Sequence, residues 1–159
     1  MKILIAADGS TYTKRMLAFI AAHDEWLGPQ HSYTVFHCVP AIPHRAAAFV
    51  GKQQVQAFYE DDAEAVFKPI RALFERHSLA VDFVHRIGSA GSTISKFAGR
   101  RKFDLIILGT YGHGAVAGLV MGSVATKVIS LCSTPVLLVR QIPVVFGAFL
   151  VERPGSAAA

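Results

Sequence analysis

A series of glycines follows a short apolar run in the C-terminal third of the chain, and its spacing is suited to holding a phosphate. The apolar run is Leu105 to Leu108, and the glycines after it are Gly109, Gly112, Gly114, Gly118 and Gly122. Glycine lets backbone N–H groups approach a ligand closely, and Ser123 adds a hydroxyl beside the last glycine. We expect a strand that leads into a phosphate-binding loop.

The residues after the loop predict a helix that starts at Gly122 and Ser123. Val124, Val128 and Leu131 recur at helical spacing. The first turn of a helix offers unpaired N–H groups and the positive end of the helix dipole. We therefore expect the N–H groups of Gly122, Ser123 and Val124 to face a phosphate, and a Gly122→Val change to weaken binding more than Ser123→Ala.

Asp8 is a second candidate for the same site. It follows the apolar run Lys2 to Ala7, at the carboxyl end of a predicted strand. There its carboxylate can accept ribose hydroxyls or bind a Mg²⁺ ion held by phosphates. Its alternative role is to cap the helix that begins near Ser10 or Thr11.

The sequence does not show the residue spacing that is typical of a P-loop, a dinucleotide fingerprint, a metal site or a catalytic triad. Gly51-Lys52 has neither the upstream glycine nor the Ser or Thr of a P-loop, and no acidic residue stands downstream of Gly112-x-Gly114 where a dinucleotide fingerprint has one. The 7 histidines show no metal-ligand spacing, so we predict no metal held by the protein alone. No Ser-His-Asp or Cys-His pairing can be argued, and no catalytic residue is assigned.

The loop residues spell G-x-x-G-x(9)-G-S, and here the sequence resembles the ATP-binding branch of the universal stress protein family. The resemblance runs in order from Lys2 to about Arg140. It includes ADGS at Ala7 to Ser10, FHCVP at Phe36 to Pro40 and TPVLLVR at Thr134 to Arg140.

This resemblance implies an α/β fold, a nucleotide site at the glycine loop and a tendency to form homodimers. It implies ATP as the ligand, with Mg²⁺ bound through the phosphates. It places Asp8 at the nucleotide and other matching residues against the base or sugar. Cys38 stands where the family more often has valine, which keeps a small apolar wall. The expected binding residues are Ala6, Asp8, Cys38, Leu108, Gly109, Gly112, Gly122, Ser123 and Val124.

Alternating strand and helix patterns position these residues. Strands are predicted at Lys2 to Ala7, Ser32 to Val39, Ala80 to Ile87, Leu105 to Leu108 and Pro135 to Val139. Helices are predicted at Thr11 to Glu25, Val50 to His77, Ser92 to Arg100 and after Ser123. The segment Ala41 to Phe49 is predicted without regular structure, because it holds Pro43 and has no clear period.

The alternation predicts right-handed crossovers and a doubly wound, five-stranded parallel sheet with helices on both faces. The family resemblance implies the strand order 3-2-1-4-5. In that order the first and fourth strands are neighbours where the winding reverses. The Asp8 turn and the Gly109 loop should then open on one crevice, where ligands bind in such sheets.

The length and composition predict one domain over residues 1–140, followed by a tail, 141–159, of unknown role. A chain of 159 residues with 52% hydrophobic residues can fill one core. The apolar part of the tail, Ile142 to Val151, is able to pack on the sheet or on a partner, whereas Pro154 to Ala159 is typical of a disordered end or an expression remnant.

The net charge and the two cysteines limit the cellular location and the kinds of partner that we expect. The net charge of +5 is spread along the chain and indicates a solvated basic surface. Arg100, Arg101 and Lys102 are the densest run, but no aromatic platform surrounds them, so nucleic-acid binding is not favoured. Cys38 and Cys132 are predicted to be buried thiols in a reducing compartment. Without a signal peptide or a membrane helix, we expect a cytoplasmic protein.

The function we expect is that of an ATP-binding regulatory protein of the stress response that acts as a homodimer. Bound nucleotide would order the Gly109 to Ser123 loop and alter a surface seen by partners. The apolar strand Pro135 to Val139 would otherwise lie at a sheet edge, which favours pairing between copies. Two alternatives stay open, a slow ATPase without an evident base and an interaction module for protein or nucleic acid. The regulated process and the preferred adenine nucleotide are not indicated.

Overall fold

A computed structural model describes residues 1–23, 25–112 and 121–140 of the chain. The predicted tail, 141–159, and the loop spacer from 113 to 120 lie outside the described residues.

The sheet has the predicted order, β3-β2-β1-β4-β5, and all pairs are parallel. Its strands are β1 (Lys2–Ala6), β2 (Ser32–Val39), β3 (Val81–Ile87), β4 (Leu105–Gly109) and β5 (Val136–Val139). Strand β1 lies between β2 and β4, with Ala6 opposite Phe36 on one side and Leu108 on the other. The carboxyl ends of β1 and β4 therefore lie side by side, where the winding reverses.

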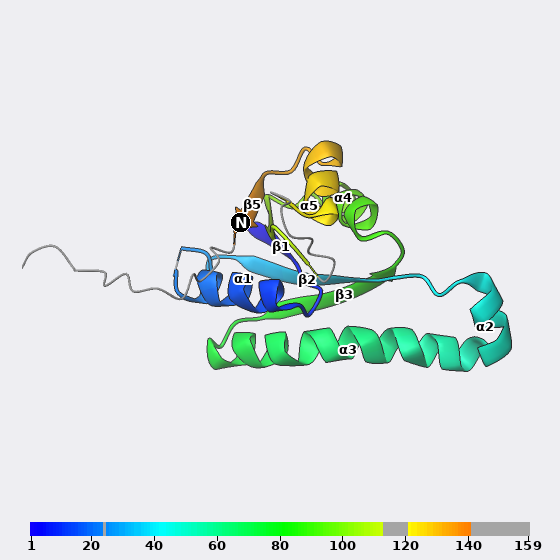
Figure 1. Cartoon of the computed structure of the whole chain (residues 1–159). Coiled ribbons are helices and arrows are strands. Elements are labelled where there is room, and N and C mark those ends of the chain that lie inside the picture. The colour runs from blue at the N-terminus through cyan, green and yellow to red at the C-terminus, as the bar shows by residue number, and fades with distance from the viewer. Residues whose placement is uncertain (24, 113–120, 141–159) are drawn as a thin grey trace, which may run out of the picture.

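Helices cover both faces of the sheet, which confirms the predicted doubly wound α/β fold (Figure 1). The helices α1 (Thr11–Ala21) and α3 (Lys52–Arg76) lie on one face, and α4 (Ala90–Arg101) and α5 (Ser123–Leu131) lie on the other. Along β1 the side chains alternate, so that Ile3 and Ile5 join the core under α1 and α3 while Leu4 joins the core under α4 and α5. Among the described residues, no helix combines the length and the apolar character that a membrane span requires.

Three predicted element boundaries are wrong. The first helix ends at Ala21 rather than Glu25, and the segment predicted to be irregular contains a short helix, α2 (His44–Val50). Pro43 does not prevent α2, because it occupies the N-cap position, where no helical N–H is needed. Helix α4 is capped at Ser89 rather than Ser92. Gly91 belongs to this helix and not to a turn. A Cβ there would lie 2.7 Å from Cβ of Lys127, so glycine lets α4 and α5 approach closely.

Several apolar side chains on the helices are exposed. Phe58 is 50% exposed, Val124 38% and Leu131 57%. On α5 the inward positions are Ala125 and Val128 instead. Both cysteines are half-buried free thiols rather than fully buried ones.

Candidate functional site

The turn after β1 is built around the carboxylate of Asp8. Its Oδ1 accepts hydrogen bonds from the Ser10 N–H (3.0 Å) and the Thr13 hydroxyl (2.7 Å). The Asp8 N–H in turn donates to Thr13 Oγ1 at 3.1 Å. Ser10 is the N-cap of α1, so the capping role considered for Asp8 is realised in part, through support of the turn. These bonds hold the carboxylate in one place beside β4.

Two glycines of the loop motif are needed where chain segments approach closely. A Cβ at Gly112 would collide with Oδ2 of Asp8. A Cβ at Gly122 would lie 3.0 Å from the Thr110 carbonyl oxygen and 3.4 Å from Cα of Tyr111. The glycines thus allow the β1 turn, the end of β4 and the start of α5 to meet.

The start of α5 presents N–H groups to the same place. Gly122 is the N-cap and makes no side-chain capping bond. The Gly122 N–H, which we expected to face a phosphate, instead donates to the Thr110 carbonyl at 2.7 Å. The first bond along the helix is from Thr126 N–H to the Gly122 carbonyl, at 3.0 Å. Within the described part of the chain, the N–H groups of Ser123, Val124 and Ala125 have no recorded partner, so these are the amides that can meet a ligand.

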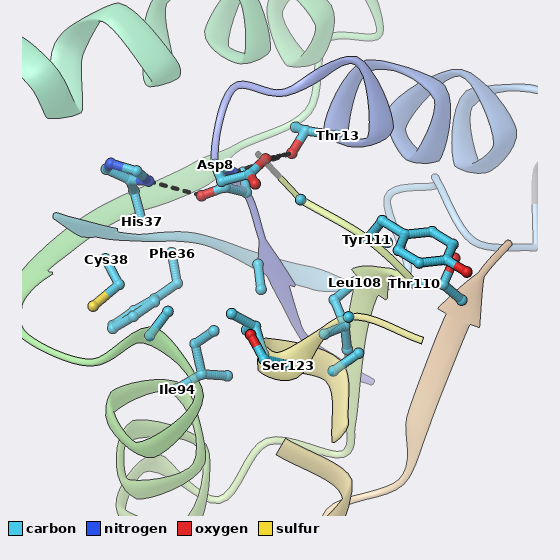
Figure 2. A pocket seen from close by; sticks show the side chains of 18 residues that line it. Asp8, Thr13, Phe36, His37, Cys38, Ile94, Leu108, Thr110, Tyr111 and Ser123 are labelled. Carbon is cyan, nitrogen blue, oxygen red and sulfur yellow. Dashed lines mark hydrogen bonds between the residues drawn. The ribbon is translucent and has the colours of Figure 1, made fainter. Parts of the chain in front are cut away.

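A cavity of about 250 Å³ lies where these elements meet. All the binding residues predicted from the sequence line it, which brings together segments from β1, β2, β4 and α5 (Figure 2). The prediction missed further lining residues, which are Ala7, Thr13, Phe36, His37, Ala90, Ile94, Thr110, Tyr111 and Ala125.

The two ends of the cavity differ in chemistry. Phe36, Cys38 and Ile94 lie together at one side, apart from Thr110 and Tyr111 at the other (Figure 2). The Cys38 thiol donates to the Gly88 carbonyl at 3.3 Å. Burial raises the pKa of this thiol, and the hydrogen bond with Thr93 opposes that shift only in part. Cys38 is therefore a neutral, weakly polar wall at neutral pH.

His37 and Thr110 are lining residues that the sequence did not single out. His37 is 5% exposed, and its ring contacts the Ala7 carbonyl at 2.8 Å and Asp62 of α3 at 3.0 Å. It joins the end of β1 to α3, which no spacing rule could reveal. Thr110 directly follows β4 and is 6% exposed, yet its hydroxyl has no hydrogen-bond partner among the residues that the structure describes. The sequence did offer one signal for Thr110, which is that it follows closely after a strand expected to end at the crevice.

Comparison with known families gives one match over most of the chain. A model described as the Universal stress protein family matches residues 1–140. A universal stress protein from Thermus aquaticus, encoded in the QAH/OAS sulfhydrylase 3' region, is 32% identical over 144 residues, which cover 87% of this chain and 97% of that protein.

Solved structures share the fold at lower identity. The universal stress protein UspA from Lactobacillus plantarum has a TM-score of 0.69 at 19% identity, over 88% of this chain and 97% of that one. A family protein from Arabidopsis thaliana with AMP bound has a TM-score of 0.65 at 11% identity, over 90% and 93%. A universal stress protein from Archaeoglobus fulgidus in complex with dAMP has a TM-score of 0.56 at 19% identity, over 87% and 96%.

Proposed function

The chain belongs to the universal stress protein family, and we propose that it binds ATP in the cavity at the carboxyl ends of β1 and β4. One observation carries the proposal. The cavity joins the open amides of the α5 N-terminus, the Asp8 carboxylate and an apolar end formed by Phe36, Cys38 and Ile94. The amides suit the phosphates, the carboxylate suits the ribose hydroxyls, and the apolar end suits the base. Structural neighbours with AMP or dAMP bound support the choice of an adenine nucleotide.

The phosphates belong at the start of α5. The N–H groups of Ser123, Val124 and Ala125 point out of the first turn, and the helix dipole adds partial positive charge there. Hydrogen bonds to a charged group are each worth about 1.5–3 kcal/mol. The Ser123 hydroxyl adds a further donor beside these amides.

The residues present fit a magnesium ion that is bound mainly through the phosphates. In the described part of the chain, no cluster of His, Cys, Asp and Glu side chains could hold a metal ion unaided. Asp8 is the carboxylate that lines the cavity, and it is already held in place by Thr13 and Ser10. Mg²⁺ commonly takes one or two protein carboxylates and completes its shell with phosphate oxygens and water.

We include a regulatory role and a homodimer in the proposal. Strand β5 ends the sheet beside β4 and consists of the apolar residues VLLV. An unpaired apolar edge favours association with a second copy. Bound nucleotide would then alter a surface that partner proteins recognise during the stress response.

A pair of variants at Ser123 tests the phosphate contact. Ser123 is the first helical residue, and Gly122 before it has φ −72° and ψ 158°, a conformation that a following proline accepts. Ser123→Pro removes the N–H and the hydroxyl, whereas Ser123→Ala removes the hydroxyl alone. Calorimetry with nucleotide-free protein should show ATP binding weakened by about tenfold or more in the proline variant, because a bond to a charged group is lost.

The alanine variant is the control for that measurement and should lose only several-fold in affinity. Both variants should melt near the parent temperature, since proline is favoured at the first position of a helix. Equal affinities of the two variants would place the phosphates elsewhere. A parent protein that binds neither ATP nor AMP would reject the proposed function.

A further inference from the structure

A second hollow of about 280 Å³ lies between β3 and α4, and four of its six lining residues are basic. Arg86 comes from β3, and Lys96, Arg100 and Arg101 come from α4. Lys96 and Arg100 are spaced so that they lie on one side of the helix, one turn apart. The hollow shares no lining residue with the cavity at β1 and β4.

These cations have no acidic partner among the described residues. No carboxylate lines the hollow, and none of the four side chains forms an ion pair. The polar contact recorded for Arg86 is to the carbonyl oxygen of its neighbour His85, at 2.8 Å. By contrast, Arg71 on α3 binds both carboxylate oxygens of Glu64, at 2.6 and 3.1 Å. Cations at the hollow are thus grouped together without the compensation found elsewhere on the surface.

The nearest acidic residue on β3 is too far away to provide that compensation. Asp82 precedes Arg86 by four positions, or about 13 Å along a strand, and lines a different hollow. That distance exceeds the screening length of about 8–10 Å at ordinary salt concentrations. The C-terminal end of α4 favours the charges of Arg100 and Arg101, but Arg86 lies on another element.

The aromatic ring of Phe97 also lines the hollow and packs against two other rings. Phe97 stacks on Phe36 at 4.8 Å and on Phe103 at 5.7 Å between ring centroids, and the Arg101 guanidinium lies 5.8 Å above it. Thr93 adds a hydroxyl oxygen at the rim. The packed rings hold one wall of the hollow, and the four exposed basic side chains line the rest of it together with Thr93.

We propose that this hollow binds a compact, multiply charged phosphate anion of the pyrophosphate or triphosphate class. Arginine presents its N–H groups in a planar fork that matches two phosphate oxygens, and several arginines around one small volume suit several adjacent phosphates. The hollow is small, at about 280 Å³, and this size suits a compact anion better than an extended polynucleotide, which needs a groove or stripe. The anion can be free or carried by a nucleotide, since the chemistry recognised is the phosphate chain.

The experiment is a titration of the full chain with inorganic tripolyphosphate, followed by calorimetry at about physiological salt concentration. The double variant Arg86→Gln/Arg100→Gln should lose at least about tenfold in affinity, because two phosphate-binding forks are removed. Arg76→Gln makes the same kind of change at an exposed arginine of α3, outside the hollow, and should bind as the parent does. Arg100→Lys keeps the charge and should show an intermediate loss.

Two further measurements distinguish anion binding at this hollow from binding in the nucleotide cavity and from nucleic-acid binding. The Ser123→Pro variant should bind tripolyphosphate normally if the hollow is the site. Loss of binding in Ser123→Pro, with the hollow variants unaffected, would move the anion to α5 and overturn the inference. A single-stranded oligonucleotide that binds more tightly than tripolyphosphate and depends on Arg86 and Arg100 would also overturn it, as would absence of tripolyphosphate binding.

Discussion

At the scale of single residues, the candidate site requires a glycine at position 112, where a side chain would not fit. Gly112 lies so close to Asp8 that a Cβ would collide with the carboxylate, although the glycine does not have a positive φ. An alanine is therefore acceptable to the backbone at this position, and its effect falls on Asp8. The requirement for glycine here is one of space.

We predict that Gly112→Ala lowers ATP affinity by about tenfold, because Asp8 must turn away from Thr13 and lose a charge-assisted hydrogen bond. Calorimetry measures the change. The matched control is Gly99→Ala on α4, where a Cβ would meet nothing within 4 Å. It should bind normally and gain about 0.5–1 kcal/mol in stability from helix propensity. Unchanged affinity in Gly112→Ala would remove Asp8 from the binding site.

Thr110→Val should stabilise the ligand-free protein. The Thr110 hydroxyl is buried and has no partner in the described part of the chain, which costs about 1–3 kcal/mol, and valine has nearly the same shape. We expect the free energy of unfolding in urea to rise by about 1 kcal/mol. Thr13→Val, which removes a buried hydroxyl bonded to Asp8 at 2.7 Å, should lower stability instead. A Thr110→Val protein less stable than the parent would contradict the assignment of an unpaired hydroxyl.

At the scale of elements, the connection between α1 and β2 is held by one phenol. The Tyr33 hydroxyl accepts from the Gly28 N–H at 2.7 Å and lies within hydrogen-bond distance of the Trp26 and Gly28 carbonyls. Its ring is buried and contacts Phe74 edge-on at 5.1 Å. The start of β2 is thereby tied to the turn before it and to α3.

Burial raises the pKa of Tyr33 above its ordinary value of 10.0, with a smaller opposing effect of the Gly28 hydrogen bond. The neutral phenol stabilises the fold fully below about pH 10, and this contribution is lost as the pH rises through the folded-state pKa. Urea unfolding at about pH 8 and about pH 10.5 should show a larger loss in the parent than in Tyr33→Phe. Equal losses in both proteins would mean that Tyr33 ionises as freely when folded as when unfolded.

At the scale of the whole molecule, the sheet has one apolar edge at β5. Bonds from Ile106 N–H to the Pro135 carbonyl and from Thr110 N–H to the Val139 carbonyl fix which backbone groups face β4. Because strand backbones alternate, the N–H groups of Val136 and Leu138 face outward. Among the described residues these outward groups have no strand partner, so they are positioned to pair with a second copy.

We predict a homodimer at tens of micromolar, measured by light scattering against a chain mass of 17.1 kDa. Val136→Pro should weaken it, because proline removes an outward N–H and is tolerated on an edge strand. Val136→Thr keeps the N–H and should remain dimeric. A monomeric parent would reject the dimer, and a dimer unaffected by Val136→Pro would place the interface away from β5.

Local pattern alone determined most of the elements. The bounds of β2, Ser32 to Val39, agree with the prediction, because strand formation depends on side chains that are neighbours in sequence. The glycine spacing and the end of the first strand were likewise readable and predicted the loop glycines, Ser123 and Asp8. The remaining candidate residues, Ala6, Cys38, Leu108 and Val124, came from the family resemblance. The strand order came from the family resemblance, since periodicity carries no information on which strands pair.

Tertiary structure decided what depends on contacts between distant segments. Gly91 lies in α4 where a Cβ would collide with Lys127 of α5, and Gly122 donates its N–H to Thr110 rather than to a ligand. Arg86 joins Arg100 and Arg101 at one hollow only because β3 and α4 are neighbours in space. The sequence revealed the dense run that contains Arg100 and Arg101, but not that Arg86, Lys96 and Phe97 line the same hollow. Such groupings arise from the path of the folded chain, and spacing along one element does not encode them.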